Sequence, residues 1–193
     1  MRFFVFARHA ETTLNVARVV NGDPAVDAPL TEKGRSQAEL LGRQVGNVPL
    51  DSCIVSHFRR TRDTAEIALA GRALPIAVEP LLGDVDVGDL EGLSLDDYRA
   101  WKLAHARAEP FPNGESLDAA AARYGRALER LLSRPEKAIL VIAHEIPIRY
   151  ALNAAEGSAD LDSPNHRIAN ATPYLFGERQ LSEAAARLSI LDT

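Results

Sequence analysis

Two runs of consecutive apolar residues stand out near the two ends of the chain. Phe3-Phe4-Val5-Phe6-Ala7 predicts a strand over residues 2–7, and residues 138–143 predict a second. Neither run alternates with polar residues, which is typical of strands buried on both faces of a sheet. Residues 51–55, residues 75–79 and Tyr174-Leu175-Phe176 predict three further strands.

Helical patterns occupy much of the chain between these strands. Thr31 is a candidate N-cap for a helix that runs to about Gln44. Further helices are predicted over residues 60–69, 94–108, 117–133 and 147–155, the last of them entered through Pro147.

Strands that alternate with helices indicate an α/β fold, with three α/β/α layers around a mostly parallel sheet. The length of 193 residues favours a single domain, 1–193. Residues 12–30 and 82–93 contain turn-forming residues and predict loops. Residues 181–191 fit either a helix or the second strand of a hairpin.

The composition is that of a soluble globular protein, with 46% hydrophobic and 25% charged residues. No apolar run approaches the roughly 20 residues of a membrane span, and the N-terminal run is too short for a signal peptide. Cys53 is the only cysteine, which argues against a disulfide or a cysteine-based metal site and favours a cytoplasmic protein. A net charge of −5 argues against nucleic acid as the main partner, although a local arginine cluster could still hold an anionic substrate.

The candidate chemistry lies where the two most apolar strands end. The first strand runs into Arg8-His9 and the second into His144. Because the carboxyl ends of parallel strands meet at one edge of a sheet, where open α/β folds bind ligands, we expect these residues to form one site. A guanidinium group can hold an anion, and an imidazole beside it can attack that anion or give it a proton.

Several ordered motifs accompany these strand ends. They are Arg8-His9-Ala10-Glu11-Thr12 with Asn15, Asp27-Ala28-Pro29-Leu30-Thr31, Ser56…Arg60…Thr64-Ala65, the loop from Leu82 to Gly92 with Asp84, and Leu140 to His144 with Ile148-Arg149. In this order the sequence resembles the histidine phosphatase superfamily, which includes the cofactor-dependent phosphoglycerate mutases and fructose-2,6-bisphosphatases. The resemblance covers residues 3 to about 152, with a weaker match near Asn170.

The resemblance implies a role for each matching residue. His9 would attack phosphorus and form a phosphohistidine, while Arg8, Arg60 and His144 would surround the phosphoryl oxygens. His9 must be neutral and aimed, so we expect a backbone carbonyl to hold its other ring nitrogen. The implied chemistry uses no metal ion and no cofactor. The expected substrate-binding residues are Asn15, Asn21, Gly22 and Glu145.

Three residues depart from the family pattern. Ala10 replaces a glycine, which requires a negative φ at that position. Asp84 stands where the family usually has a glutamate as proton donor. Glu145 replaces the glycine that usually follows the second histidine; its carboxylate would repel a phosphate dianion or, aimed at the leaving oxygen, could itself be the acid. The sequence therefore leaves Asp84, which we favour, and Glu145 as candidate acids.

These residues also have purely structural interpretations. His9 could be a core histidine, and Asp84 could be one acid of a solvated loop. Arg60 could be a solvated residue at a helix start, which is the role we expect for Arg59 and Arg62.

Three functions remain open from the sequence. The favoured one is a phosphomonoesterase that acts on a small substrate, with a singly phosphorylated sugar or acid preferred. A mutase is the first alternative, although only about 50 residues separate Gly92 from His144 and leave little to close over a substrate. A non-catalytic phosphate-binding relative is the second, with Glu145 as its best support. The sequence decides neither the substrate nor the oligomeric state.

Overall fold

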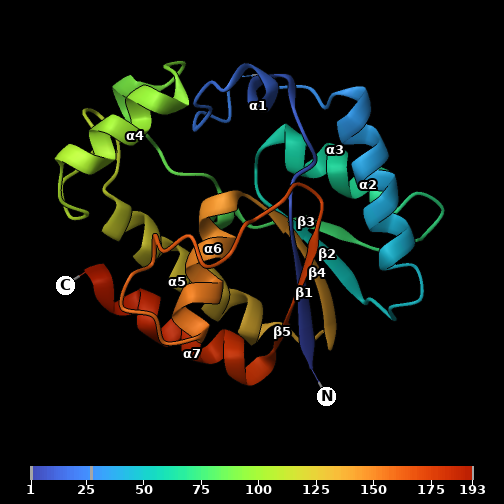
Figure 1. Cartoon of the computed structure of the whole chain (residues 1–193). Helices are drawn as coiled ribbons and strands as arrows, with labels where there is room; N and C mark the ends of the chain where they lie inside the picture. The colour runs from blue at the N-terminus through green and yellow to red at the C-terminus, as the bar shows by residue number, and fades with distance from the viewer. Residues whose placement is uncertain (1, 27, 193) are drawn as a thin grey trace.

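A five-stranded sheet forms the centre of the molecule, in the order β3-β2-β4-β1-β5 (Figure 1). The computed structural model describes residues 2–26 and 28–192, so Asp27 of the second motif lies outside the described residues. The strands are β1 (Phe3–Arg8), β2 (Ser52–Val55), β3 (Ile76–Val78), β4 (Ala138–Ala143) and β5 (Pro173–Gly177). Neighbouring strands are parallel except β1 and β5, which confirms the mostly parallel sheet.

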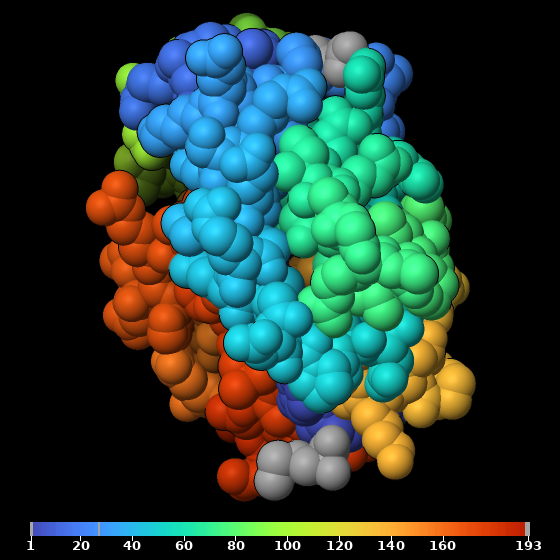
Figure 2. Space-filling model, turned by 90° about the vertical axis from the view of Figure 1, so that its right-hand side faces the viewer, coloured from blue at the N-terminus to red at the C-terminus, as the bar shows by residue number. Residues whose placement is uncertain are grey.

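Helices cover both faces of this sheet. Helices α2 (Glu32–Gln44) and α3 (Arg59–Ala68) cover one face, and Figure 2 shows them packed side by side. The other face carries α5 (Leu117–Ser133), α6 (Glu145–Ala155) and α7 (Glu178–Ser189). These layers confirm the predicted three-layer architecture. Within the described residues, no helix has the length and apolar character needed to cross a bilayer.

Smaller elements lie outside the three layers. The short helices α1 (Thr13–Ala17) and α4 (Leu95–Ala104) lie beyond the end of the sheet where β1 and β4 terminate (Figure 1). The 3-10 turns are η1 (Pro80–Leu82), η2 (Gly88–Leu90) and η3 (Ile190–Asp192).

The side chains of β1 alternate between two apolar layers. Phe4 and Phe6 pack against α5 and α7, whereas Val5 and Ala7 face α2 and α3. Burying each phenylalanine contributes roughly 1.5–3 kcal/mol, and a slip of one residue would move both rings into the opposite layer. The register Arg8↔Ala143 is therefore well specified, and it places His9 beside His144.

The structure adds one helix to the predicted elements, moves the ends of two others, and decides the alternative that the sequence left open for the C-terminal segment. Residues 13–17 form α1 inside the expected loop, because Thr12 and Asn15 make a capping box. Helix α6 begins at Glu145 rather than Pro147, since a proline is tolerated in the first turn, where N–H groups lack helical partners. Helix α4 ends at Ala104. Residues 181–189 belong to α7, so the helical alternative holds for the C-terminal segment.

Candidate active site

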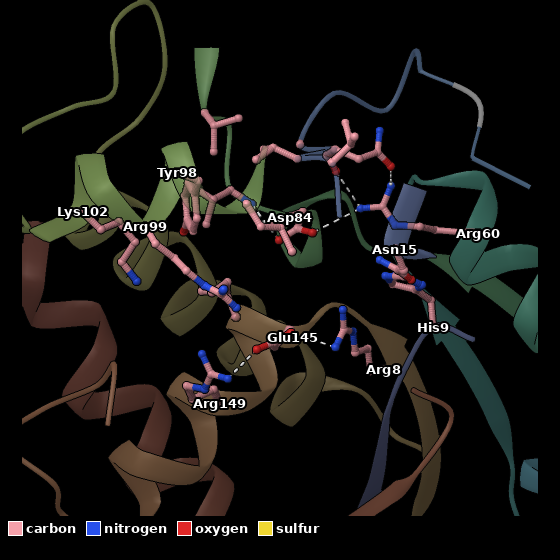
Figure 3. Close-up of a pocket in the computed structure, with 18 of the residues that line it drawn as sticks. Arg8, His9, Asn15, Arg60, Asp84, Tyr98, Arg99, Lys102, Glu145 and Arg149 are labelled. Carbon is pink, nitrogen blue, oxygen red and sulfur yellow. Dashed lines mark hydrogen bonds and ion pairs between the residues drawn. The ribbon is translucent and has the colours of Figure 1, made fainter. Parts of the chain in front are cut away.

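A cavity of about 490 Å³ opens where β1 and β4 end (Figure 3). Eight of the nine predicted site residues line it: Arg8, His9, Asn15, Asn21, Gly22, Arg60, Asp84 and Glu145. The ninth, His144, lies directly behind them, with its ring centre 5.4 Å from that of His9. The structure thus brings together residues from the whole length of the chain.

Hydrogen bonds hold one ring nitrogen of His9 and the backbone on either side of its peptide group. Its Nδ1 donates to the carbonyl of Ala10 at 2.8 Å, as the sequence predicted, and this leaves Nε2 as the unprotonated nitrogen. The Ala10 N–H donates to Thr64 Oγ1 at 3.0 Å, and Asn170 Nδ2 donates to the carbonyl of His9 at 2.8 Å. Ala10 is not among the described residues with positive φ, so its methyl group is tolerated.

Both histidines are buried and uncharged. Burial lowers the pKa of His9 well below 6.5, and the nearby charges of Arg60 and Arg8 lower it further. The pKa of His144 is lowered in the same way, by burial first and then by Arg60. His144 Nδ1 accepts from Arg60 at 3.1 Å, so Nε2 carries its proton and donates to Ser56 Oγ at 2.8 Å. A neutral His9 is the form that can act as a nucleophile.

Two arginines flank the histidines. Arg60, which is 4% exposed, donates to Asn21 Oδ1 at 2.6 Å and to the Asn21 carbonyl at 3.0 Å. Arg8 donates from Nη1 to the Ile168 carbonyl at 3.1 Å. The Nε of Arg8 is buried and has no hydrogen-bond partner among the described residues. That donor is free for a phosphoryl oxygen, whereas Arg59 and Arg62 are exposed, as expected.

Asp84 and the carbonyl of Asn21 contact the same nitrogen of Arg60, Nη2. Its Oδ2 is 3.2 Å from Arg60 Nη2 and 3.4 Å from His144 Nδ1. Burial raises the pKa of Asp84, while the charge of Arg60 opposes that rise. A raised pKa favours the protonated form that a general acid must have. Asp84 is therefore not a member of a fully solvated loop.

Arg123 of α5 holds the loop that carries Asp84, and the sequence analysis did not find it. Its guanidinium donates to the carbonyls of Leu81, Gly83 and Asp84 at 2.8, 3.1 and 3.1 Å. Glu115 pairs with Arg123 and also accepts from the N–H of Asp86 at 2.9 Å. The only signal in the sequence is an arginine beside the four consecutive alanines of a buried helix.

Glu145 lies across the cavity from Asp84, between two arginines (Figure 3). Its Oε2 is 2.7 Å from Arg8 Nη1, and its Oε1 pairs with Arg149 Nη2. The carboxylate thus contacts the same arginine that the resemblance assigns to the phosphoryl group.

The three remaining predicted residues line the cavity from the N-terminal segment. Asn15 Oδ1 accepts from the Thr12 N–H, which leaves its amide group to donate. Asn21 acts through Arg60. The N–H of Gly22 is taken by Glu91 Oε2 at 2.7 Å, and a Cβ there would lie 2.3 Å from the Val85 carbonyl, so glycine is required for close packing.

The outer part of the cavity is mainly apolar. Its wall includes the following residues from four segments: Val19, Val20, Val85, Val87, Leu95, Tyr98 and Ile146. Lys102 and Arg99 of α4 lie at the rim. Across residues 2–26 and 28–192, no group of three His, Cys, Asp or Glu side chains is arranged to hold a metal ion.

The sequence as a whole was compared with known proteins. A family model described as the histidine phosphatase superfamily (branch 1) matches residues 4–188. The chain belongs to this superfamily. The match confirms the family, the fold and the enzyme class that the sequence predicted.

Individual members of the superfamily are similar over most of the chain. A protein of Erwinia tasmaniensis named as a probable phosphoglycerate mutase is 35% identical over 71% of this chain and 66% of its own length, so the match spans about two thirds of that relative. The adenosylcobalamin/alpha-ribazole phosphatase of Salmonella typhimurium is 34% identical over 72% of this chain and 71% of its own length. The crystal structure of the alpha-ribazole phosphatase of Shigella flexneri superposes with a TM-score of 0.79 at 27% identity, covering 90% of this chain and 89% of that one.

Burial of two neutral histidines predicts that acidification destabilises the fold. The unfolded chain binds protons at His9 and His144 below about pH 6.5, whereas the folded chain does not until the pH is much lower. The free energy of unfolding therefore decreases as the pH is lowered through this window, by up to about 1.4 kcal/mol per pH unit for each histidine. Asp84, whose raised pKa acts in the opposite sense, limits the loss at lower pH. Urea unfolding at several pH values measures the slope, and His9→Asn should reduce it; a flat profile in the wild type would contradict the burial of neutral rings.

The contacts of Arg123 predict that it positions Asp84. Arg123→Gln should lower kcat/KM for an alkyl phosphate by about tenfold to a hundredfold. It should have a smaller effect on 4-nitrophenyl phosphate, whose leaving group needs less protonation. The control is Arg179→Gln, an exposed arginine of α7. Equal losses on both esters would indicate a general structural defect instead.

Proposed function

We propose that this histidine phosphatase hydrolyses a small phosphomonoester through a phosphohistidine on His9. The observation that carries the proposal is the Nδ1 bond of His9 to the Ala10 carbonyl, together with the lowered pKa of the ring. A neutral imidazole with a fixed Nε2 lone pair, beside two guanidinium groups, is suited to attack an anion that it would otherwise repel.

The first step transfers the phosphoryl group to the enzyme. The Nε2 lone pair of His9 forms a bond to phosphorus as the bond from phosphorus to the alcohol oxygen breaks. Arg8 and Arg60 surround the phosphoryl oxygens and stabilise the charge that spreads over them, and His144 orients Arg60 because its Nδ1 accepts from that guanidinium. Asp84 gives its proton to the departing alkoxide, which leaves as the alcohol.

The second step returns the enzyme to its starting state. A water molecule attacks phosphorus, its proton passes to the Asp84 carboxylate, and the bond from phosphorus to Nε2 breaks. Inorganic phosphate leaves, and His9 is again neutral. One carboxyl group therefore serves as acid and then as base, in accordance with microscopic reversibility.

Phosphoryl transfer back to a bound intermediate is the second candidate, because one relative is named as a phosphoglycerate mutase. A mutase must retain the intermediate while water is excluded. In this chain the segment over the cavity is α4, a helix of 10 residues that contributes no buried side chain. A thin cover of this kind favours entry of water and hydrolysis.

The proposal is tested by release of inorganic phosphate from a panel of phosphomonoesters without added metal. Wild-type protein should turn over at least one alkyl or aryl ester, and His9→Ala should abolish that turnover. Rapid quenching should trap acid-labile phosphate on the wild-type chain alone. Full activity in His9→Ala would overturn the covalent mechanism, and transfer between substrates without phosphate release would favour the mutase.

The identity of the acid is a separate prediction. Asp84→Asn should lower kcat/KM for an alkyl phosphate by on the order of 10²-fold or more, because the alkoxide then leaves unprotonated. Glu145→Gln should keep most of the activity on an ester with an uncharged alcohol, because Glu145 is engaged by Arg8 and Arg149. The reverse pattern would make Glu145 the acid.

A further inference from the structure

Two carboxylates flank the route that the alcohol part of a substrate must take. His9, Arg8 and Arg60 fix the phosphoryl end of the cavity, as proposed above. Asp84 and Glu145 lie on opposite walls (Figure 3). The alcohol leaves from the side of Asp84 into the cavity that Glu145 also lines.

Glu145 changes its electrostatic role when the phosphoryl group arrives. Its Oε2 is 2.7 Å from Arg8 Nη1, so the negative charge of Glu145 and the positive charge of Arg8 neutralise each other. When a phosphoryl dianion binds Arg8, the dianion neutralises the charge of Arg8 in place of Glu145. The Glu145 carboxylate, with 34% of its side chain exposed, then faces the alcohol with Arg149 as its remaining partner.

The cations at the rim are compensated as well. Lys102 pairs with Asp162 at 2.8 Å, and Arg99 pairs with Asp96 at 3.2 Å. Arg149 pairs with Glu145 itself. An anionic substituent on the alcohol would therefore meet Glu145 without an unpaired cation of the outer wall to receive it.

From this arrangement we propose that Glu145 selects phosphomonoesters whose alcohol carries no negative charge near the ester oxygen, and rejects those that carry a carboxylate there. This inference rests on the proposed function and names the substrate class for the same site. It favours a neutral sugar or polyol over the phosphorylated acid that the sequence left open. It also predicts that phosphoglycerate is a poor substrate of this chain, since phosphoglycerate carries a carboxylate close to the phosphate.

The test uses two esters of nearly the same shape. In sn-glycerol 1-phosphate a hydroxymethyl group stands where D-3-phosphoglycerate has a carboxylate, with the same configuration at the central carbon. The wild type should prefer the glycerol ester in kcat/KM, and Glu145→Gln should reduce that preference by about fivefold to tenfold, as expected for one like charge at a partly exposed position. Most of the change should come from the carboxylate-bearing ester, because the substitution also frees Arg149 to receive its charge.

Two further variants show whether the effect comes from local charge. Arg149→Gln leaves Glu145 without its outer partner, so the preference for the glycerol ester should increase rather than decrease. Glu183→Gln changes the net charge by the same amount on an exposed part of α7 and should leave the ratio unchanged. An unaltered ratio in Glu145→Gln, or a wild-type preference for 3-phosphoglycerate, would overturn the inference.

Binding measurements separate this inference from the proposed function. Calorimetric titration of His9→Ala with each ester gives the ratio of the two dissociation constants without any turnover. The double variant His9→Ala, Glu145→Gln should reduce that ratio by the same factor. A wild type that releases phosphate from no ester of the panel, combined with this binding shift, would refute the phosphatase proposal and keep the selectivity. Equal binding of the two esters to both variants would refute the selectivity, whatever the outcome for hydrolysis.

Discussion

The site depends on keeping two imidazole rings uncharged beside two guanidinium groups. Burial disfavours the protonated rings, and each arginine adds to the effect. The positive charge is therefore concentrated on Arg8 and Arg60, whose geometry suits oxyanions, while His9 keeps its lone pair. Because the rings must be buried, the sheet has to present them from strand ends that are themselves in the core, and the register of β1 on β4 does this.

The loop that carries Asp84 is held in place by Arg123, a residue of α5. Asp84 lies on a loop, and a loop alone would not fix a carboxyl group within 3.2 Å of Arg60. Arg123 supplies the missing rigidity, because its guanidinium binds three carbonyls of that loop from a long helix packed on the sheet. A buried arginine here stabilises a conformation of the loop, rather than a charge on the substrate. His9 and Asp84 thus belong to two frameworks that meet at Arg60.

Much of this arrangement was predictable because local sequence determined it. Arg8, His9 and His144 follow buried strands directly, so their place at the sheet edge follows from hydrophobic pattern alone. The contacts of Arg123 and Asn170 could not be derived in this way, since they join residues about 40 and 160 positions apart. Helix α1 was missed because its five residues contribute no buried side chain and only the capping box marks it. The pairing of Glu145 with Arg8 depends on the start of α6, which the sequence placed two residues late.

The position of β1 has a consequence for synthesis of the chain. This strand is made before the other four, yet both of its neighbours, β4 and β5, come last among the strands. A nascent chain therefore carries a highly apolar segment with two unpaired edges until β4 and β5 have also been made. Such segments associate readily with other chains. We expect the emerging polypeptide to depend on chaperones that shield β1, and the cavity around His9 to be among the last parts of the molecule to form.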